Sequence, residues 1–294
     1  MKILVTGSKG QLARSLVERA PRFRDVELVT IGRPGLDLTD RDRTISTILA
    51  KRPDIVISTA AYTAVDQAED EPELAYAVNA AGAAHAAEAT ALAGVPIIHI
   101  STDYVFAGTS PEPYTEDCST VPSSIYGLTK LEGERAVARI NPRHAIVRTS
   151  WVYSPFGHNF VRSMLRMARD RREIRIVADQ WGNPTSALDL ADALLTVATK
   201  LGQGRFGVYH LTGQGETNWS GFARHIFWCS RAAGGPSADV VDIPAADYLV
   251  RARRPANSRL CGNKVDAEFG LMRPDWHGST DIVVRRLLSE AANG

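Results

Sequence analysis

The sequence predicts an α/β fold: a doubly wound parallel sheet followed by a smaller C-terminal substrate domain. Apolar runs without polar alternation recur over the first 150 residues, and segments with helical spacing separate them. Strands that are buried on both faces have this uniform apolar character, and regular alternation of strands with helices is typical of a parallel sheet. A glycine-rich turn comes directly after the first apolar run, where sheets of this kind bind phosphates.

The chain divides at about residue 150, where this alternation ends. Residues 1–150 are expected to form a dinucleotide-binding domain, and residues 172–213 to return to its sheet. Residues 151–171 and 214–294 are left for the substrate-binding domain. We expect strands over residues 2–6, 26–31, 54–61, 95–100, 144–149, 174–178 and 208–212, and later helices over 160–169 and near 219–232.

Composition narrows the class of protein. The 34 Lys and Arg residues nearly balance the 33 Asp and Glu residues, so no net field favours nucleic acid or an anionic membrane as a partner. Three cysteines at wide spacings suit neither a disulfide framework nor a zinc site. The N-terminal apolar run is too short for a signal peptide, and no later stretch is suited to span a bilayer. We expect a cytoplasmic enzyme that acts on small molecules.

The turn after the first strand has the spacing of a dinucleotide-binding motif. Gly7 can form the tight turn, Gly10 can let the backbone approach a diphosphate, and small Ala13 can let the next helix pack on the sheet. Gln11 and Leu12 open that helix, whose N-terminus favours phosphate, and they join the expected cofactor contacts. An ordinary strand-to-helix turn is the alternative.

The residues after the second strand bear on the choice of cofactor. An NAD-preferring site usually has an acid there, but this chain has Arg33, whose guanidinium can hold the 2′-phosphate of NADPH. An exposed loop arginine is the alternative. Asp37 and Leu38 are expected to line the adenine pocket, although Asp37 could instead cap the next helix at Thr39 or Asp40. We predict NADPH as the cofactor, with NADH also accepted.

The third and fourth strands end in small and polar residues. Ala61, Tyr62 and Thr63 follow the third strand at the edge where open α/β sheets bind ligands, and small side chains there leave room for a cofactor. After the fourth strand, Thr102 can donate a hydrogen bond to a carbonyl oxygen as charge develops during reduction, with Asp103 beside it. Two residues that cap a loop are the alternative.

Tyr126 and Lys130 lie four residues apart, and on a helix this spacing places both on one face. A cation beside a phenol favours phenolate, so Lys130 is expected to lower the pKa of Tyr126 toward neutrality. The pair could then exchange a proton with a substrate oxygen. A surface helix with an unrelated Tyr and Lys is the alternative.

Other features leave their alternatives open. Trp151, after the fifth strand, suits core packing or stacking on a ring equally. The arginines of residues 253–260 could bind a substrate diphosphate or form a solvated face. The seven histidines show no pair at metal-ligand spacing, so no metal site is expected. Hydrolase and kinase motifs are also absent from the sequence.

Several segments together resemble the dTDP-4-dehydrorhamnose reductase family, which belongs to the extended short-chain dehydrogenases/reductases with a Rossmann sheet. The likeness covers nearly the whole chain. It rests on the glycine turn with Gln11, residues 59–69 (TAAYTAVDQAE), 101–106 (STDYVF), 126–130 (YGLTK), 148–153 (RTSWVY), 179–185 (DQWGNPT) and 253–260 (RRPANSRL).

The resemblance implies hydride transfer from NADPH to the C4 ketone of dTDP-4-dehydro-L-rhamnose, giving dTDP-L-rhamnose. It assigns Tyr126 as the proton donor, Lys130 to the nicotinamide ribose and Thr102 to the carbonyl oxygen. It also implies that Asp103 and Trp151 contact the sugar nucleotide, and that Ala61, Tyr62 and Thr63 contact the cofactor.

The chain departs from the family pattern at three positions. Some bacterial members carry glutamates that hold magnesium between subunits, but Ser15 and Leu188 stand there, which argues against a magnesium-bridged dimer. A monomer or a plain homodimer is expected. Tyr62 replaces a common His, which leaves room for a different substrate. The alternatives are a reductase of another dTDP-4-keto-deoxysugar, of the antibiotic or dihydrostreptose type, a 4-epimerase, or a non-catalytic nucleotide-binding regulatory subunit.

Overall fold

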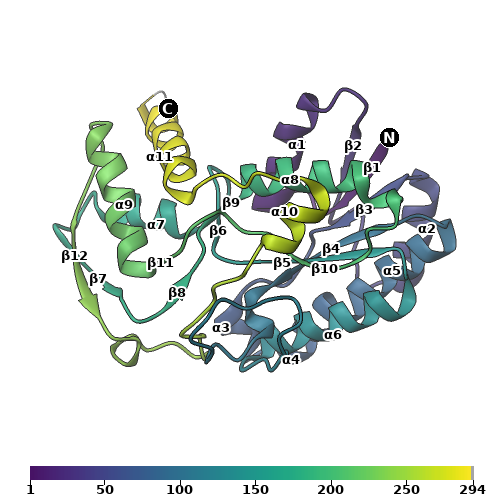
Figure 1. Ribbon diagram of the computed structural model, residues 1–294, viewed down its shortest axis with the longest axis horizontal. Helices are drawn as coiled ribbons and strands as arrows, with labels where there is room; N and C mark the ends of the chain where they lie inside the picture. The colour runs from purple at the N-terminus through teal and green to yellow at the C-terminus, as the bar shows by residue number, and fades with distance from the viewer. Residues whose placement is uncertain (293–294) are drawn as a thin grey trace.

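A six-stranded parallel sheet forms the centre of the protein, with the strand order β10-β5-β4-β3-β1-β2 (Figure 1). The computed structural model describes residues 1–292. The doubly wound parallel sheet predicted from the sequence is confirmed. Its strands are β1 (Lys2–Thr6), β2 (Glu27–Ile31), β3 (Ile55–Ser58), β4 (Ile97–Thr102), β5 (His144–Thr149) and β10 (Gly207–His210).

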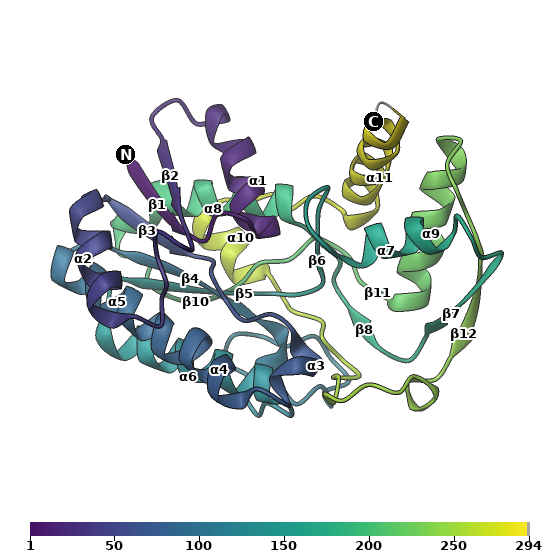
Figure 2. The same cartoon turned by 180° about the vertical axis from the view of Figure 1, so that it is seen from behind.

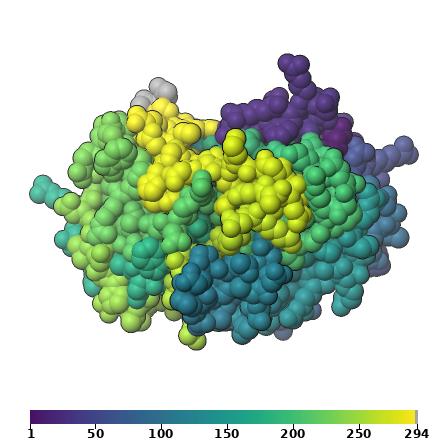
Figure 3. All heavy atoms as spheres, in the orientation of Figure 1, coloured from purple at the N-terminus to yellow at the C-terminus, as the bar shows by residue number. Residues whose placement is uncertain are grey.

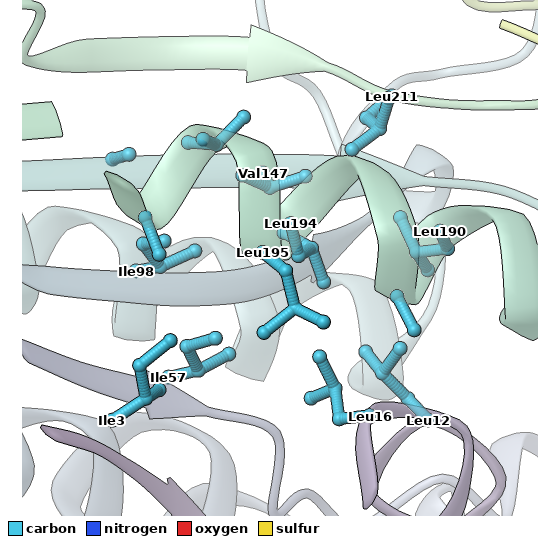
Figure 4. Close-up of a cluster of buried hydrophobic side chains, with 14 of the residues drawn as sticks. Ile3, Leu12, Leu16, Ile57, Ile98, Val147, Leu190, Leu194, Leu195 and Leu211 are labelled. Carbon is cyan, nitrogen blue, oxygen red and sulfur yellow. The ribbon is translucent and has the colours of Figure 1, made fainter. Parts of the chain in front are cut away.

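Helices cover both faces of this sheet. Successive residues of a strand point to opposite faces, and apolar side chains on each face pack against helices. Ile3 and Val5 of β1 face a cluster formed with one set of helices, whereas Leu4 faces the other set. Figure 4 shows leucines of the first set between the sheet and α1. The first set is α1 (Gln11–Arg19), α8 (Ala187–Lys200) and α10 (Asn263–Phe269), and the second is α2 (Arg41–Lys51), α5 (Gly82–Ala93) and α6 (Ile125–Ile140).

The strand order reverses at β1, which pairs with β2 on one side and β3 on the other. Successive crossovers therefore leave β1 in opposite directions, and a crevice opens beyond the carboxyl ends of β1 and β3. Open α/β sheets bind their ligands at this topological switch point. Two short helices, α3 (Val65–Ala68) and α4 (Pro72–Tyr76), and a π-helical stretch (Ala77–Ala81) follow β3 beside the crevice.

A second unit lies beyond the carboxyl end of β5 (Figures 1 and 2). Its core is aromatic: Phe222 contacts the rings of Tyr153, Phe160 and Trp276. Its elements are α7 (Phe160–Met167), α9 (Trp219–Ala232), α11 (Trp276–Ala292) and the strand pairs β7 (Glu173–Val177) with β12 (Asp239–Ile243), β8 (Trp181–Gly182) with β11 (Thr217–Asn218), and β6 (Val152–Tyr153) with β9 (Thr185–Ser186).

The expected return of residues 172–213 to the main sheet is too wide, and the structure corrects it. Of the strands in this range, β10 joins the six-stranded sheet, whereas β7 pairs with β12 in the second unit. The cause is visible in the burial of β7, which alternates at its start between exposed and buried residues. This pattern is typical of a strand with one solvent-exposed face, whereas a strand covered on both faces is buried throughout.

A segment that follows β12 of the second unit packs back on the first unit. In the space-filling view, the segment that ends in α10 packs against α8 and against the loop that precedes α6 (Figure 3). Backbone hydrogen bonds fix this contact, since Tyr114 N donates to Arg259 O and Cys261 N donates to Tyr114 O, both at 2.8 Å. All three cysteines are free thiols. Within residues 1–292 there is no helix with both the length and the apolar character to cross a membrane.

Helix α6 packs unusually close to the π-helical stretch, and this contact generates a stability prediction. A Cβ added at Gly133 would lie 2.3 Å from Asn79 O, a backbone atom that cannot move alone. We therefore expect Gly133→Ala to destabilise the protein by about 1–3 kcal/mol in urea unfolding. Gly278 is the matched control, because it is also helical and its Cβ would meet nothing within 4 Å. Gly278→Ala should stabilise by up to about 1 kcal/mol. Equal effects of the two substitutions would contradict the packing argument.

Candidate active site

The glycine turn after β1 has the geometry of a phosphate-binding turn. Gly7 has a φ of +96°, which favours glycine, and its N–H donates to Ile31 O at 2.7 Å. A Cβ at Gly7 would also lie 3.2 Å from Thr59 Oγ1. Gly10 is the N-cap of α1, and no side chain caps the free N–H groups of that helix. A Cβ at Gly10 would meet nothing within 4 Å, so the backbone here is open to a ligand.

A cleft of about 1130 Å³ runs from this turn past the carboxyl ends of β1, β3, β4 and β5. It is large enough for more than one small ligand. Fourteen of the fifteen predicted site residues line this cleft, and Tyr62 is the exception. The fourteen are Gly7, Gly10, Gln11, Leu12, Arg33, Asp37, Leu38, Ala61, Thr63, Thr102, Asp103, Tyr126, Lys130 and Trp151.

The side chain of Tyr62 turns away from the cleft that its neighbours Ala61 and Thr63 line. Its hydroxyl donates to Glu71 Oε2 at 2.7 Å, outside the cleft, because the loop after β3 turns this side chain toward the start of α4. The backbone of Tyr62 is held from the other side by Asn79, whose amide accepts from Tyr62 N and donates to Tyr62 O and Thr129 Oγ1. The buried Asn79 therefore ties the end of β3 to α6.

The residues after β2 form one wall of the cleft. Arg33 is exposed and lines the cleft, and Leu38 is buried beneath it. Asp37 Oδ1 accepts from Thr39 N at 3.0 Å and Thr39 Oγ1 at 2.8 Å, and these bonds hold the pKa of Asp37 below its usual value. The N-cap of α2 is Asp40, so Asp37 is not the helix cap.

Gln11 lines the cleft, and its side chain also forms hydrogen bonds within the protein. Its Oε1 accepts from Ser154 Oγ at 2.9 Å and from Asn159 Nδ2 at 3.0 Å. These bonds tie the start of α1 to the loop that leads into α7. Gln11 therefore joins the phosphate turn to the second unit, a link that spacing along the sequence does not reveal.

Helix α6 places Tyr126 and Lys130 in the cleft, as the spacing predicted, but the pKa of Tyr126 moves in the opposite direction. Burial raises it to about 12, Thr102 lowers it and the Asp103 carboxylate raises it. The Lys130 ammonium donates instead to Ile100 O at 2.7 Å, and burial lowers its pKa to about 8. The expected lowering of the Tyr126 pKa by Lys130 is therefore wrong, because burial is the largest effect on this phenol and raises its pKa.

Thr102 and Asp103 lie together at the end of β4. Thr102 Oγ1 donates to Asp103 Oδ1 at 2.8 Å and accepts from Tyr104 N at 3.2 Å. Burial raises the pKa of Asp103 to about 6, against smaller lowering by the hydroxyls of Ser258 and Thr102. The ring of Tyr104 contacts that of Tyr126 edge-on at 5.5 Å. A hydroxyl, a carboxyl and a phenol thus converge at one edge of the sheet.

The far wall of the cleft contains residues that sequence reasoning missed or left open. Trp151 has a φ of +46° and stacks on Trp219 at a centroid distance of 3.5 Å, so it both packs and lines the cleft. Arg254 also lines the cleft, with Nη2 bonded to Asp66 at 2.9 Å. Trp219 and Arg254 come from the second unit, and only the arginine-rich motif of residues 253–260 gave a signal for either.

A dinucleotide turn, a Tyr and Lys on one helix and a hydroxyl beside the Tyr define an oxidoreductase of the extended short-chain dehydrogenase/reductase class. More particularly, the chain belongs to the family described as RmlD substrate binding domain, whose model matches residues 1–289. The predicted family resemblance is thereby confirmed.

Several proteins similar to this chain are dTDP-4-dehydrorhamnose reductases. A dTDP-4-dehydrorhamnose reductase of Sinorhizobium fredii is 49% identical, with 99% of each chain covered. A crystal structure of a dTDP-4-dehydrorhamnose reductase from Clostridium acetobutylicum has a TM-score of 0.92 at 36% identity, covering 98% of this chain and 100% of that one. Another, from Bacillus anthracis in complex with NADP, has a TM-score of 0.89 at 35% identity, covering 98% and 99%.

The burial of Asp103 generates a prediction about stability. Its pKa of about 6 lies above the ordinary 3.8, so the fold favours the neutral acid and loses stability as pH rises through this window. Asn resembles the neutral acid. We expect Asp103→Asn to stabilise the protein by about 1–3 kcal/mol above pH 6, a gain that disappears below about pH 4.

Urea unfolding at several pH values measures this gain. Asp239→Asn is a suitable control, because Asp239 is an exposed aspartate. Its stability difference should not follow the same pH window. A gain for Asp103→Asn that is constant from low to high pH would contradict the assigned cause.

Proposed function

We propose that this protein reduces the C4 ketone of dTDP-4-dehydro-L-rhamnose to dTDP-L-rhamnose, with NADPH as the reductant. The observation that carries the proposal is the convergence of Thr102, Tyr126 and Lys130 on the cleft that begins at the glycine turn. The family and the relatives named above support the same reaction. NADH is the weaker alternative cofactor.

The residues of the cleft fit a dinucleotide. The uncapped N-terminus of α1 at Gly10 suits a diphosphate, and Arg33 suits the 2′-phosphate of NADPH. Ala61 and Thr63 line the edge of β3 near the nicotinamide end, and Lys130 is placed for the ribose. When bound, the cofactor supplies a hydride to the ketone carbon. The relative from Bacillus anthracis was solved with NADP.

The chain itself supplies the proton. Reduction turns the ketone oxygen into an alkoxide, which needs an acid beside it. Because burial raises the pKa of Tyr126, its phenol stays protonated at neutral pH and is ready to donate. Thr102 is placed to orient the same oxygen once its hydroxyl turns from Asp103. Lys130, when protonated, favours the phenolate that remains.

The second unit is proposed to hold the sugar nucleotide. Asp103 and Trp151 line the same cleft as Tyr126, which supports their assignment to the sugar. Arg254 lines the cleft and bonds to Asp66 through Nη2, so other N–H groups of its guanidinium can bind a diphosphate oxygen. Tyr62 points out of the cleft and gives no reason to expect a different substrate.

The proposal includes a cytoplasmic enzyme that is a monomer or a homodimer. A magnesium bridge of the kind suggested by some family members is not part of it. Ser15 and Leu188 are both buried, and neither offers a carboxylate to a metal ion.

The direct test follows NADPH oxidation with purified dTDP-4-dehydro-L-rhamnose and identifies the product by NMR. Tyr126→Phe removes the proton donor but keeps the ring, so we expect a loss of about 10²–10⁴-fold in kcat. NADPH binding, measured by calorimetry, should be retained within a few-fold. Tyr153→Phe is a matched control, because Tyr153 is buried in the second unit and bonds to Thr280.

Each other outcome points to a different function. Oxidation only with another dTDP-4-keto sugar would identify a reductase of that deoxysugar. Interconversion of epimers without net NADPH consumption would indicate a 4-epimerase. Nucleotide binding without turnover of any keto sugar, or full activity of Tyr126→Phe, would favour a regulatory protein.

Arg33 gives a separate prediction about cofactor choice. The guanidinium is expected to contact the 2′-phosphate, which NADH lacks. Arg33→Ala should therefore raise KM for NADPH by about tenfold or more and change KM for NADH by less than about twofold. Arg43 lies nearby, bonded to Pro34 O, and Arg43→Ala is the control for a general loss of positive charge. Equal effects of Arg33→Ala on both cofactors would refute the assignment.

A further inference from the structure

Behind the catalytic lysine lies a buried histidine that the mechanism does not use. His99 is on β4, is 1% exposed, and its Nε2 lies 3.5 Å from Lys130 Nζ. Its other ring nitrogen, Nδ1, has no hydrogen-bond partner among residues 1–292. Buried polar groups are usually paired, so a histidine that meets one cation and leaves a nitrogen unpaired needs an explanation.

The contact follows from a match between a strand and a helix. Residues 99 and 101 of β4 point to the same face, about 6 to 7 Å apart, and residues 130 and 134 of α6 are about 6 Å apart along the helix. His99 therefore meets Lys130 while Ser101 Oγ bonds to Glu134 Oε1. The two pairs form a polar ladder between β4 and α6.

The second rung is already neutralised. Arg148 of β5 donates to Glu134 from Nε at 3.0 and 3.2 Å and from Nη2 at 2.7 Å. Both carboxylate oxygens of Glu134 therefore accept from Arg148, and neither bonds to Lys130. Glu134 still raises the pKa of Lys130, but burial lowers it more, to about 8. The Lys130 ammonium needs acceptors of its own, and it has Ile100 O at 2.7 Å and His99 Nε2.

We propose that His99 is a positioning residue for Lys130: its neutral imidazole accepts from the ammonium at Nε2 and, with Ile100 O, aims the remaining N–H into the cleft. A lysine side chain has large rotamer freedom, and two fixed acceptors remove much of it before the cofactor arrives. This inference rests on the proposed function, because it gives Lys130 the task of binding the nicotinamide ribose.

The arrangement requires an uncharged histidine. A protonated imidazole would repel the ammonium, but burial and the Lys130 charge both hold the pKa of His99 well below its usual value. With Nε2 as the acceptor, the ring proton must lie on Nδ1. The charged groups that bear on Lys130 are Glu134 from its own helix and, through Glu134, Arg148 from β5. His99 is the titratable group that faces it from β4.

The first test uses the wild-type protein without cofactor. Long-range ¹H–¹⁵N NMR spectra should show a His99 ring that stays neutral from about pH 6 to about pH 9 and carries its proton on Nδ1. A proton on Nε2, or a ring that becomes charged in this range, would overturn the proposal. This test needs neither NADPH nor a sugar substrate, so it does not depend on the proposed reaction.

The second test uses variants and the pH dependence of NADPH affinity, measured by calorimetry. His99→Leu removes the acceptor at similar volume, so the charged form of Lys130 loses a partner and its pKa falls. We expect the pH above which NADPH binding weakens to fall by about 0.5 to 1 unit, and affinity at about pH 8 to fall about three- to tenfold. His99→Gln keeps a polar group near Nε2 and should restore most of this loss.

His210→Leu is the matched control. His210 is also fully buried in the sheet, on β10, and bonds to Tyr114 O. It should destabilise the protein without moving the pH dependence of NADPH binding. A His99→Leu variant that loses stability but keeps the wild-type affinity and pH dependence would show a purely structural role and refute the proposal. If the wild type binds no NADPH at any pH, the proposed function fails, and the NMR result still decides the state of His99.

Discussion

The structure depends on the close approach of α6 to the backbone that follows β3 and β4. A Cβ at Gly127 would lie 2.2 Å from Tyr104 O, and one at Gly133 would lie 2.3 Å from Asn79 O. The helix can take this position only because both residues lack a side chain. The approach brings Tyr126 to Thr102 and lets Lys130 reach Ile100 O. The backbone contacts of α6 therefore determine where the side chains of Tyr126 and Lys130 lie at this edge of the sheet.

The elements closest to the chemistry were predictable because local patterns specify them. The strands of the main sheet are mostly apolar, the glycine turn follows β1 directly, and a spacing of four places Tyr126 and Lys130 on one helical face. The direction of the Tyr126 pKa was not predictable from spacing, since it depends on burial and on Asp103, which the fold brings close. The direction of the Tyr62 side chain was also not predictable, because it depends on a hydrogen bond from its hydroxyl to Glu71 that forms only in the folded protein. Trp219 and Arg254 reach the cleft from far along the chain, and only Arg254 lies in a motif, residues 253–260, that the sequence singled out.

Burying polar groups at the carboxyl ends of the strands costs folding free energy. The apolar clusters on the two faces of the sheet offset this cost. Asp103, Lys130, Glu134 and Arg148 are all nearly fully buried. The Glu134–Arg148 pair satisfies its charges internally, whereas Asp103 and Lys130 have pKa values shifted toward their neutral forms. Shifts of this kind mark groups held for function at the expense of stability. The two clusters that sandwich the sheet contain mostly aliphatic side chains and provide the compensating burial.

The two units divide the labour between chemistry and recognition. The proposed proton donor, Tyr126, and the residues that contact it lie on α6 and at the end of β4, whereas Trp219 and Arg254 belong to the second unit. Trp151 lies between them, in a left-handed conformation that a bulky residue adopts only when its surroundings hold it there. Trp219 stacks on one side of its ring, and Gly182 has no side chain, where a Cβ would lie 2.4 Å from the ring. Because Trp219 in turn packs on Phe160, the shape of the sugar end of the cleft depends on the aromatic core of the second unit. Substitutions in that core can therefore alter which keto sugar fits while the acid and the cofactor site stay unchanged.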